Sequence, residues 1–400
     1  MVPAAQILQA MKGMKTLRSG RNRRKWIYVL LLMGLLGLSG CGSPSSASVE
    51  MSSQTELVKT GSMELQYAEN FAVDYYEDGY KMLTTLPDSK RYLLVPEGQP
   101  VPRGLDEDVS ILQEPLQNIY LVASGVMDMF ASLDAVGQIR FSGQKQENWY
   151  IQTAKDAMAA GDMIYAGKYS KPDYELLVSE GCDLAIENRM ITHSPEVVEM
   201  LQSFDIPVMI EYSSYEQHPL GKVEWVKFFG ALTGKEAEAE EAFAEQTEIL
   251  EKVESGEKTG KTIAFFYVTS NGLIQVRQST DYIPKLIELA GGRYIFEDLE
   301  DSGSGRSTLN MQVEDFYAGA RDADILIYNS SIDGGVTTLD ELIGKCNILK
   351  DFKAVQEGQV YCTTNDMYQQ SMAIGYLLQD MHTVLTDDDT AKLRYLFLLQ

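Results

Sequence analysis

The stretch PLGKVEWVKFFGALTGKEAEAEEAFAEQTEILEKVE, residues 219–254, separates two halves of the chain that share one kind of pattern. Its proline suits the first turn of a helix. We expect Gly230 and Gly234 to break that helix, and the glutamate-rich residues 235–254 to form a second one. The second helix is roughly 30 Å long at 1.5 Å per residue, about one domain diameter. The stretch therefore predicts a stiff helical connector, residues 219–258, that resists bending between the halves.

Short apolar runs alternate with helical stretches on both sides of this connector. Before it, MIYAG, DLAIE and IPVMIEY are separated by stretches such as DYELLVSEG and PEVVEMLQSF. After it, TIAFFYV, YIFED and DILIYN alternate with DYIPKLIELAGG and VEDFYAGARDA. Such alternation predicts an α/β protein with two βα lobes, residues 61–218 and 259–400, each with a mostly parallel sheet covered by helices. Residues 65–96 instead predict strands, with a hairpin at Asp78-Gly79.

The first forty residues have the form of an export signal. They hold seven cations and no acid, followed by the apolar run WIYVLLLMGLLGLSGC, which is shorter than the ~20 residues needed to cross a bilayer. The run ends in Leu38-Ser39-Gly40-Cys41, which resembles the bacterial lipoprotein signal. We therefore expect residues 1–40 to be a cleaved signal peptide, Cys41 to carry the lipid, and the serine-rich residues 41–60 to be a flexible tether. An ordinary signal peptide is the alternative.

The charge of the chain excludes several partners. Removing the seven cations of residues 1–40 takes the formal net charge from −24 to −31. A surface this acidic argues against nucleic acid, whose phosphates require basic patches, and against docking on anionic lipid through charge. We expect attachment to the outer face of the cell membrane, on the periplasmic side of a Gram-negative cell, through the lipid on Cys41.

Few residues suit catalysis, a metal site or a disulfide framework. Cys182, Cys346 and Cys362 show no CxxC spacing, so free thiols are expected, with a Cys346–Cys362 bridge as the alternative. The sequence has no glycine-rich phosphate loop, no G-x-S-x-G and no H-E-x-x-H. Three histidines also make a protein-bound metal centre improbable. The sequence predicts no enzyme, with an exported hydrolase as a remote alternative.

Several segments, in this order, carry a resemblance to a known family: YAGKYSKPDYELL, CDLAIENRMITHSPEV, IPVMIEYSSYEQHPLGKVEW, DYIPKLIELAGG and DADILIYNSSIDG. The mature chain resembles the substrate-binding lipoproteins of ABC importers that have a rigid helical connector and take up ferric siderophores, haem or cobalamin. The resemblance implies a ligand cleft between the lobes and no cofactor of its own. It also implies a monomer that delivers its ligand to a membrane permease and its ATPase subunits. A ferric siderophore is the leading ligand, with haem or cobalamin as alternatives.

Ligands of open α/β sheets bind beyond the carboxyl ends of the strands, which gives the candidate site residues. In the first lobe these are Trp149, Tyr150, Tyr165, Lys168, Tyr169, Arg189, His193, Tyr215, Glu216 and His218. In the second lobe they are Asn271, Tyr282, Arg306, Tyr328, Asn329 and Tyr368. The same loops also carry Glu187, Tyr212, Ser214, Ser270 and Arg277. Aromatic faces with a few cations suit a bulky organic ligand that bears anionic oxygens.

The loop SSYEQHP, residues 213–219, places Glu216 and His218 at the expected base of the cleft. Two roles stay open for them: contact with the ligand, or a structural role in capping and hydrogen bonding at the start of the connector. Catalysis is the least favoured reading.

Two acids are expected to dock the protein onto its permease. In the family that the chain resembles, one glutamate on each lobe pairs with permease arginines. The matching segments PDYELLVSEGCDLAI and MQVEDFYAGARDADILI place Glu175 and Glu314 near helix starts. A simple acid at the positive end of a helix is the alternative role, and Asp315 is the fallback for Glu314.

Overall fold

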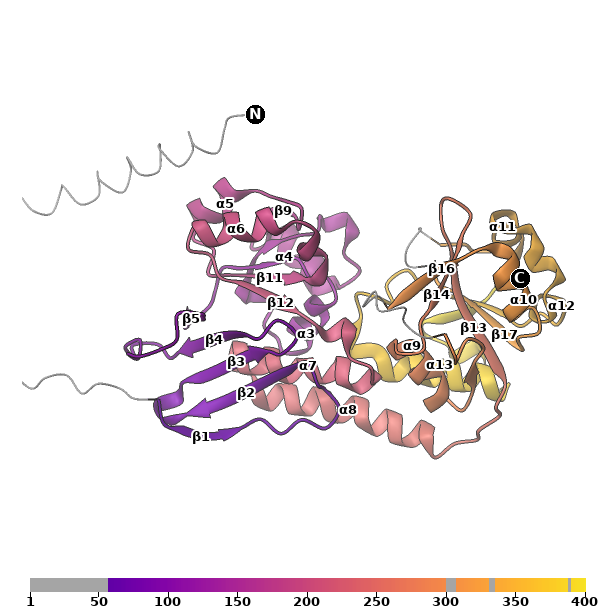
Figure 1. Ribbon diagram of the computed structural model, residues 1–400, viewed down its shortest axis with the longest axis horizontal. Coiled ribbons are helices and arrows are strands. Elements are labelled where there is room, and N and C mark those ends of the chain that lie inside the picture. The colour runs from indigo at the N-terminus through magenta and orange to yellow at the C-terminus, as the bar shows by residue number, and fades with distance from the viewer. Residues whose placement is uncertain (1–56, 300–306, 331–334, 388–389) are drawn as a thin grey trace, which may run out of the picture. The chain divides into compact units, whose positions relative to one another are not determined.

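The computed structural model describes residues 57–299, 307–330, 335–387 and 390–400 (Figure 1). The expected signal peptide, Cys41, nearly all of the tether and Arg306 lie outside these residues. In the described part, two five-stranded sheets and a seven-stranded sheet form the body of the chain. None of the described helices is long and apolar enough to cross a membrane.

The N-terminal sheet has the order β1-β2-β3-β4-β5. Its strands are β1 (Lys59–Ser62), β2 (Phe71–Tyr76), β3 (Lys81–Thr85), β4 (Lys90–Val95) and β5 (Val109–Gln113). Neighbouring strands are antiparallel except β4 and β5. Asp78 and Gly79 both have positive φ, 57° and 84°, in the turn between β2 and β3. This turn confirms the hairpin that the sequence predicted, because two-residue turns of this type need left-handed backbone.

The first-lobe sheet is wholly parallel, in the order β12-β11-β6-β7-β8. Its strands are β6 (Ile119–Leu121), β7 (Ile139–Ser142), β8 (Ile164–Tyr165), β11 (Leu184–Asn188) and β12 (Val208–Glu211). The helices between them are α3 (Val126–Ser132), α4 (Gln152–Ala160), α5 (Tyr174–Glu180) and α6 (Pro195–Ser203), and a small hairpin joins β9 (Gly167–Lys168) to β10 (Lys171–Pro172). The predicted βα alternation of this lobe is confirmed.

The connector consists of two helices, α7 (Pro219–Thr233) and α8 (Glu236–Glu254), which pack against each other. The expected break at Gly230 is wrong, because α7 continues through Gly230 and ends at Gly234, whose φ is 72°. Gly230 instead permits the close approach of the two helices. A Cβ at this position would lie 2.6 Å from the Cβ of Ala239 on α8.

The second-lobe sheet has the order β16-β14-β13-β17-β18-β19, with β15 beside β13. Its strands are β13 (Thr262–Val268), β14 (Ile274–Arg277), β15 (Arg293–Tyr294), β16 (Thr308–Met311), β17 (Ile325–Tyr328), β18 (Val360–Thr363) and β19 (Leu396–Leu398). The centre is parallel, but β14, β16 and β19 run antiparallel to their neighbours, so this sheet is mixed. The helices are α9 (Tyr282–Leu289), α10 (Val313–Ala320), α11 (Leu339–Lys345), α12 (Lys353–Gln356) and α13 (Ile374–Thr386). Cys182, Cys346 and Cys362 are free thiols, as expected.

One hydrophobic core runs through both lobes. It includes Leu121 and Ile186 of the first-lobe sheet, Trp225 of α7, Phe243 of α8 and Ile327 of the second-lobe sheet. Separate smaller cores cover the opposite face of each lobe's sheet, under α5 and α6 in the first lobe and under α10 to α12 in the second. The lobes are therefore joined by packed apolar side chains, in addition to the chain that connects them.

Two buried carboxylates hold the segment before β2 against α7. Glu224 is fully buried and accepts hydrogen bonds from the backbone N–H groups of residues 66, 67 and 68 at 2.8 to 2.9 Å. Glu216 accepts from the N–H groups of residues 69 and 70 at 2.9 and 3.0 Å, and from Trp225 Nε1 at 2.8 Å. We call this arrangement the carboxylate clamp. It ties the N-terminal sheet to the connector through five consecutive backbone donors.

Removing Glu224 should strongly destabilise the protein. The variant Glu224→Ala leaves three backbone N–H groups without their acceptor and removes the carboxylate 3.6 Å from the buried Lys227 ammonium. We expect a loss of about 3–5 kcal/mol in the free energy of unfolding, measured by urea denaturation. The exposed Glu241→Ala on α8 is the control, with a change within about 0.5 kcal/mol. Equal effects of the two substitutions would contradict the clamp.

Glu187, near the end of β11, is a buried acid without a partner. Its side chain is 0% exposed, and neither carboxyl oxygen forms a hydrogen bond with any described group. Burial raises the pKa of Glu187 to about 8. The side chain is therefore held as a neutral carboxylic acid near neutral pH.

This burial predicts a pH-dependent stability. As pH rises from about 4.5 to about 8, the unfolded chain releases the Glu187 proton before the folded protein does, so the folded state loses stability. The variant Glu187→Gln lacks this loss. Its stability relative to the parent should rise by roughly 1.4 kcal/mol per pH unit across that window, measured by urea unfolding at pH 5, 6.5 and 8. Substitution of the exposed Glu199 of α6, Glu199→Gln, should show no such trend. A pH-independent difference for Glu187→Gln would refute the buried, neutral state.

Candidate functional site

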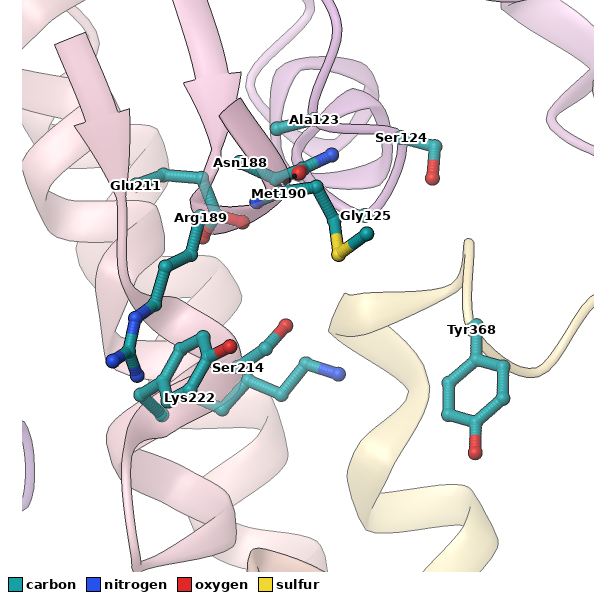
Figure 2. Close-up of a pocket in the computed structure, with 11 residues that line it drawn as sticks. Ala123, Ser124, Gly125, Asn188, Arg189, Met190, Glu211, Ser214, Lys222 and Tyr368 are labelled. Atoms are coloured by element: carbon teal, nitrogen blue, oxygen red, sulfur yellow. Dashed lines mark hydrogen bonds between the residues drawn. The ribbon is translucent and has the colours of Figure 1, made fainter. Parts of the chain in front are cut away.

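A cavity of about 270 Å³ lies between the two lobes (Figure 2). Three neighbouring parallel strands of the first lobe, β6, β11 and β12, end at this place. Loops after parallel strands meet at one edge of a sheet, where α/β proteins bind ligands. The cavity is lined by Ala123, Ser124, Gly125, Asn188, Arg189, Met190, Glu211, Ser214, Tyr215, Lys222 and Tyr368. We call it the interlobe cavity.

The loop after β11 supplies a cation and a thioether. Asn188 Oδ1 accepts a hydrogen bond from the N–H of Met190 at 2.8 Å and fixes the turn. The Arg189 guanidinium lies 4.6 Å from the ring centroid of Tyr215, which belongs to the loop after β12. Met190 and Tyr215 are 49% and 39% exposed, so both present apolar surface at the cavity. This wall combines positive charge with apolar faces.

Charged groups lie deeper, where α7 begins. The Lys222 side chain is buried, and its ammonium lies 4.7 Å from the ring centroid of Tyr282. Glu211 Oε2 accepts hydrogen bonds from Ser213 N at 2.9 Å and Ser213 Oγ at 2.6 Å. Burial raises the pKa of Glu211, while the Ser213 bonds and the charge of Lys222 oppose that rise.

The wall of the second lobe is formed by Tyr368, which stands across the cavity from Lys222 (Figure 2). The Tyr368 hydroxyl accepts hydrogen bonds from Arg277 and from Asn329 Nδ2, the latter at 2.6 Å. Arg277 is itself buried and pairs with Asp281 at 3.3 Å. These contacts fix the Tyr368 ring at the edge of the cavity.

Direct hydrogen bonds join the lobes beside the cavity. The Gln369 side chain accepts from Tyr150 N and donates to Asn148 O, both at 2.8 Å. Met372 N donates to Asp128 Oδ2 at 2.7 Å. Burial raises the pKa of Asp128 to about 6, against the opposing effects of this bond and of Lys222. The segment that carries Tyr368 is thus fastened to the first lobe by two residues that follow the tyrosine, Gln369 and Met372.

A second cavity of about 350 Å³ lies beside the loop that precedes α7. Its lining comprises Tyr67, Glu69, Gln217, His218, Ser279, Thr280, Asp281 and Lys285. His218 Nδ1 accepts a hydrogen bond from Leu220 N at 3.2 Å and caps α7, and its ring stacks on Tyr67 at 4.5 Å. Burial lowers the pKa of His218, and the nearby Lys285 lowers it further. Of the two roles left open for Glu216 and His218, the structure shows the structural one for both: the clamp and the helix cap.

The structure brings Arg189, Tyr215 and Tyr368 together around the interlobe cavity, with Asn329 and Tyr282 directly behind its lining. Tyr150 is exposed beside it and bonded through its backbone to Gln369. Whether these residues contact a ligand stays a prediction.

Other predicted residues stand apart from the cavity. Trp149 is 1% exposed and donates to Ser142 Oγ at 3.1 Å, and Tyr328 is fully buried in the second-lobe core. Both have packing roles instead of a face on the cavity. Tyr165, Lys168 and His193 are exposed elsewhere on the first lobe, Tyr169 packs against a core, and Asn271 lies in the β13–β14 turn. The position of Arg306 is not described.

Several residues that the sequence patterns did not single out line or border the site: Lys222, Glu211, Asp128, Met190 and the loop 123–125. The sequence does contain a signal for Lys222: it is a lysine in an otherwise apolar turn, three residues after the proline that starts α7, which is unusual for a residue that faces solvent. Asp128 offered none, because a single acid in a short helix looks like a solvated one. Among the described residues, no three His, Cys, Asp or Glu side chains are grouped to hold a metal ion.

Two relatives cover almost the whole chain. Both are uncharacterized lipoproteins of Methanocaldococcus jannaschii. One is 24% identical over 396 residues, covering 90% of this chain and 92% of its own length. The other is 23% identical over 371 residues, covering 86% and 90%.

Solved structures of similar fold include a periplasmic haem-binding protein of Vibrio cholerae, with a TM-score of 0.53 at 14% identity, covering 67% of this chain and 98% of that one. A protein of an Fe3+-hydroxamate transport system of Saccharomonospora viridis has a TM-score of 0.52 at 16% identity, covering 68% and 93%. At these identities the likeness shows the fold alone. Residues 125–367, more than half of the chain, match the family model of the periplasmic binding proteins. The resemblance drawn from the sequence is thereby confirmed, and the chain belongs to the periplasmic binding protein family.

Proposed function

We propose that this protein is the extracytoplasmic substrate-binding lipoprotein of an ABC importer, and that it captures a ferric siderophore or similar iron chelate. Members of the family are binding proteins and not enzymes. The observation that carries the proposal is the interlobe cavity, where Arg189 and Lys222 supply positive charge and Tyr215, Tyr368 and Met190 supply organic contact surface. Anionic oxygens and an organic shell are what such a lining accommodates.

The size of the cavity favours a compact chelate over the alternatives, haem and cobalamin. The volume of about 270 Å³ lies just below the ~300–1,000 Å³ typical of ligand pockets. The similar proteins from Vibrio cholerae and Saccharomonospora viridis are described as binding haem and as part of Fe3+-hydroxamate transport. Both descriptions concern iron in an organic shell, which supports an iron chelate as the ligand here.

Anchoring and delivery complete the proposal. Lipidation of Cys41 would hold the protein at the outer face of the membrane, in line with the lipoprotein names of its archaeal relatives. The monomeric protein would then pass its ligand to a permease and its ATPase subunits. In the structure, Glu175 and Glu314 are exposed in the first turns of α5 and α10, so both carboxylates are accessible for docking.

Ligand capture can be tested on protein purified from cells. Protein from iron-replete culture should carry visible absorbance of a ferric chelate, and protein from iron-depleted culture should not. Ferric chelates added to the stripped protein should raise its melting temperature, because a ligand that binds only the folded state stabilises it. If cobalamin or haem raises the melting temperature and no ferric chelate does, that molecule is the ligand and the iron-chelate proposal is wrong. Turnover of ester or phosphate substrates would overturn it.

Docking can be tested separately from capture. The double variant Glu175→Lys, Glu314→Lys should leave chelate affinity unchanged and abolish chelate uptake by cells, because complementary charge fixes the docking orientation. The matched control is Glu199→Lys, Glu248→Lys, which reverses two other exposed acids and should transport normally. Normal uptake by the Glu175, Glu314 double variant would refute the docking assignment.

A further inference from the structure

Helix α7 contains two buried lysines, and among the residues that the structure describes only Lys227 has a counter-ion. Every residue of α7 except Thr233 is buried, and Lys222 and Lys227 are each 4% exposed. The Lys227 ammonium lies 3.6 Å from Glu224 and 3.0 Å from Glu240. Lys222 forms no ion pair with any described carboxylate, and its ammonium contacts the Tyr282 ring. A buried charge without a partner is costly, so its persistence calls for an explanation.

The acids near Lys222 are already engaged. Glu211 accepts two hydrogen bonds from Ser213, and Asp128 accepts one from Met372 N. The charge of Lys222 lowers the pKa of both acids, but neither carboxylate lies within 4.0 Å of the lysine ammonium, the limit for an ion pair. Burial also disfavours the charged form of each acid. The Lys222 side chain lines the interlobe cavity and extends toward the side on which Tyr368 stands, so its positive charge faces that cavity (Figure 2).

The cavity presents a second cation, which comes from the first lobe. Arg189 lines it from the loop after β11, backed by the Tyr215 ring at 4.6 Å. Ser124, Ser214 and Asn188 add polar groups to the first-lobe wall. Two cations with these hydrogen-bonding groups on one wall suit a ligand that carries at least two anionic oxygens.

We infer that Lys222 determines which charge of ligand this protein accepts: its buried ammonium anchors an anionic oxygen of a compact, negatively charged ferric chelate of the hydroxycarboxylate class, and Arg189 binds a second one. This inference rests on the proposed function and narrows it. Neutral ferric chelates gain nothing from this anchor and leave the Lys222 charge buried and unmatched.

The test measures the affinity of the full-length protein, freed of any bound ligand, for two probes: ferric citrate and a neutral ferric trihydroxamate. Wild type should bind ferric citrate more tightly, with an affinity that falls as salt rises. Lys222→Met should weaken ferric citrate binding by about tenfold to a hundredfold, which is the range for one charge-assisted hydrogen bond, and leave trihydroxamate binding unchanged or stronger. Lys222→Arg should restore most of the preference. Lys258→Met removes an exposed lysine and should change neither affinity.

The outcomes separate the inference from the function. Equal binding of both probes by wild type, or a ferric citrate preference that Lys222→Met leaves intact, overturns the inference while iron-chelate capture stands. Binding of neither probe, with stabilisation only by a ligand that is not a ferric chelate, such as cobalamin or haem, overturns both. Since wild-type selectivity and its salt dependence require no substitution, a misfolded Lys222→Met variant would still leave the inference open to refutation.

Discussion

Helix α7 is buried along almost its whole length, and the carboxylate clamp fixes what surrounds it. Five consecutive backbone N–H groups of residues 66–70 donate to Glu216 and Glu224, so the N-terminal sheet is held to the helix through charged hydrogen bonds. The same helix packs on α8 at Gly230 and contributes Trp225 to the core shared by both lobes. Its first turn carries Lys222 into the interlobe cavity. The position of the site therefore depends on how firmly α7 is held.

A shared core changes how a two-lobed binding protein can work. Apolar packing of α7 and α8 against α9 and α13 continues from one lobe into the other. The bonds of Gln369 and Met372 to the first lobe add to this packing beside the cavity. Opening the lobes widely would require exposing part of that core, so the structure favours a ligand site that is largely formed in advance. Selectivity then comes from side chains already in place.

The sequence predicted the architecture well, because the spacing of apolar residues along the chain decides where helices and strands form. Alternating apolar runs, the proline at residue 219 and the Asp78-Gly79 turn each have a local physical cause, and each appears where expected. Gly230 shows where local reasoning fails: glycine disfavours a helix interior, but here the close approach of α8 outweighs that preference. In the second lobe the centre of the sheet is parallel, as expected, while the residues of β14, β16 and β19 give no sign that these strands run antiparallel.

The site was predicted less well, because burial depends on tertiary contacts. Arg189, Tyr215 and Tyr368 reach the cavity from strand ends, as their positions suggested. Trp149 and Glu216 occupy similar loops, yet find partners within the protein, Ser142 for the tryptophan and the backbone of residues 69–70 for the glutamate. No local pattern distinguishes these cases. Asp128 accepts its hydrogen bond from Met372, which is 244 residues away in the sequence. The role of Lys222, a lysine inside an apolar helix, can be inferred only when the cavity beside the helix is known.

A crystal structure of the protein loaded with its ferric chelate, with the iron located by anomalous scattering, tests the central claim most directly. The account predicts one iron in the interlobe cavity, with anionic oxygens of the chelate within hydrogen-bonding distance of Lys222 and Arg189, and Tyr368 on the opposite side. Iron in the second cavity around His218, or a chelate in the interlobe cavity that contacts neither cation, would contradict it.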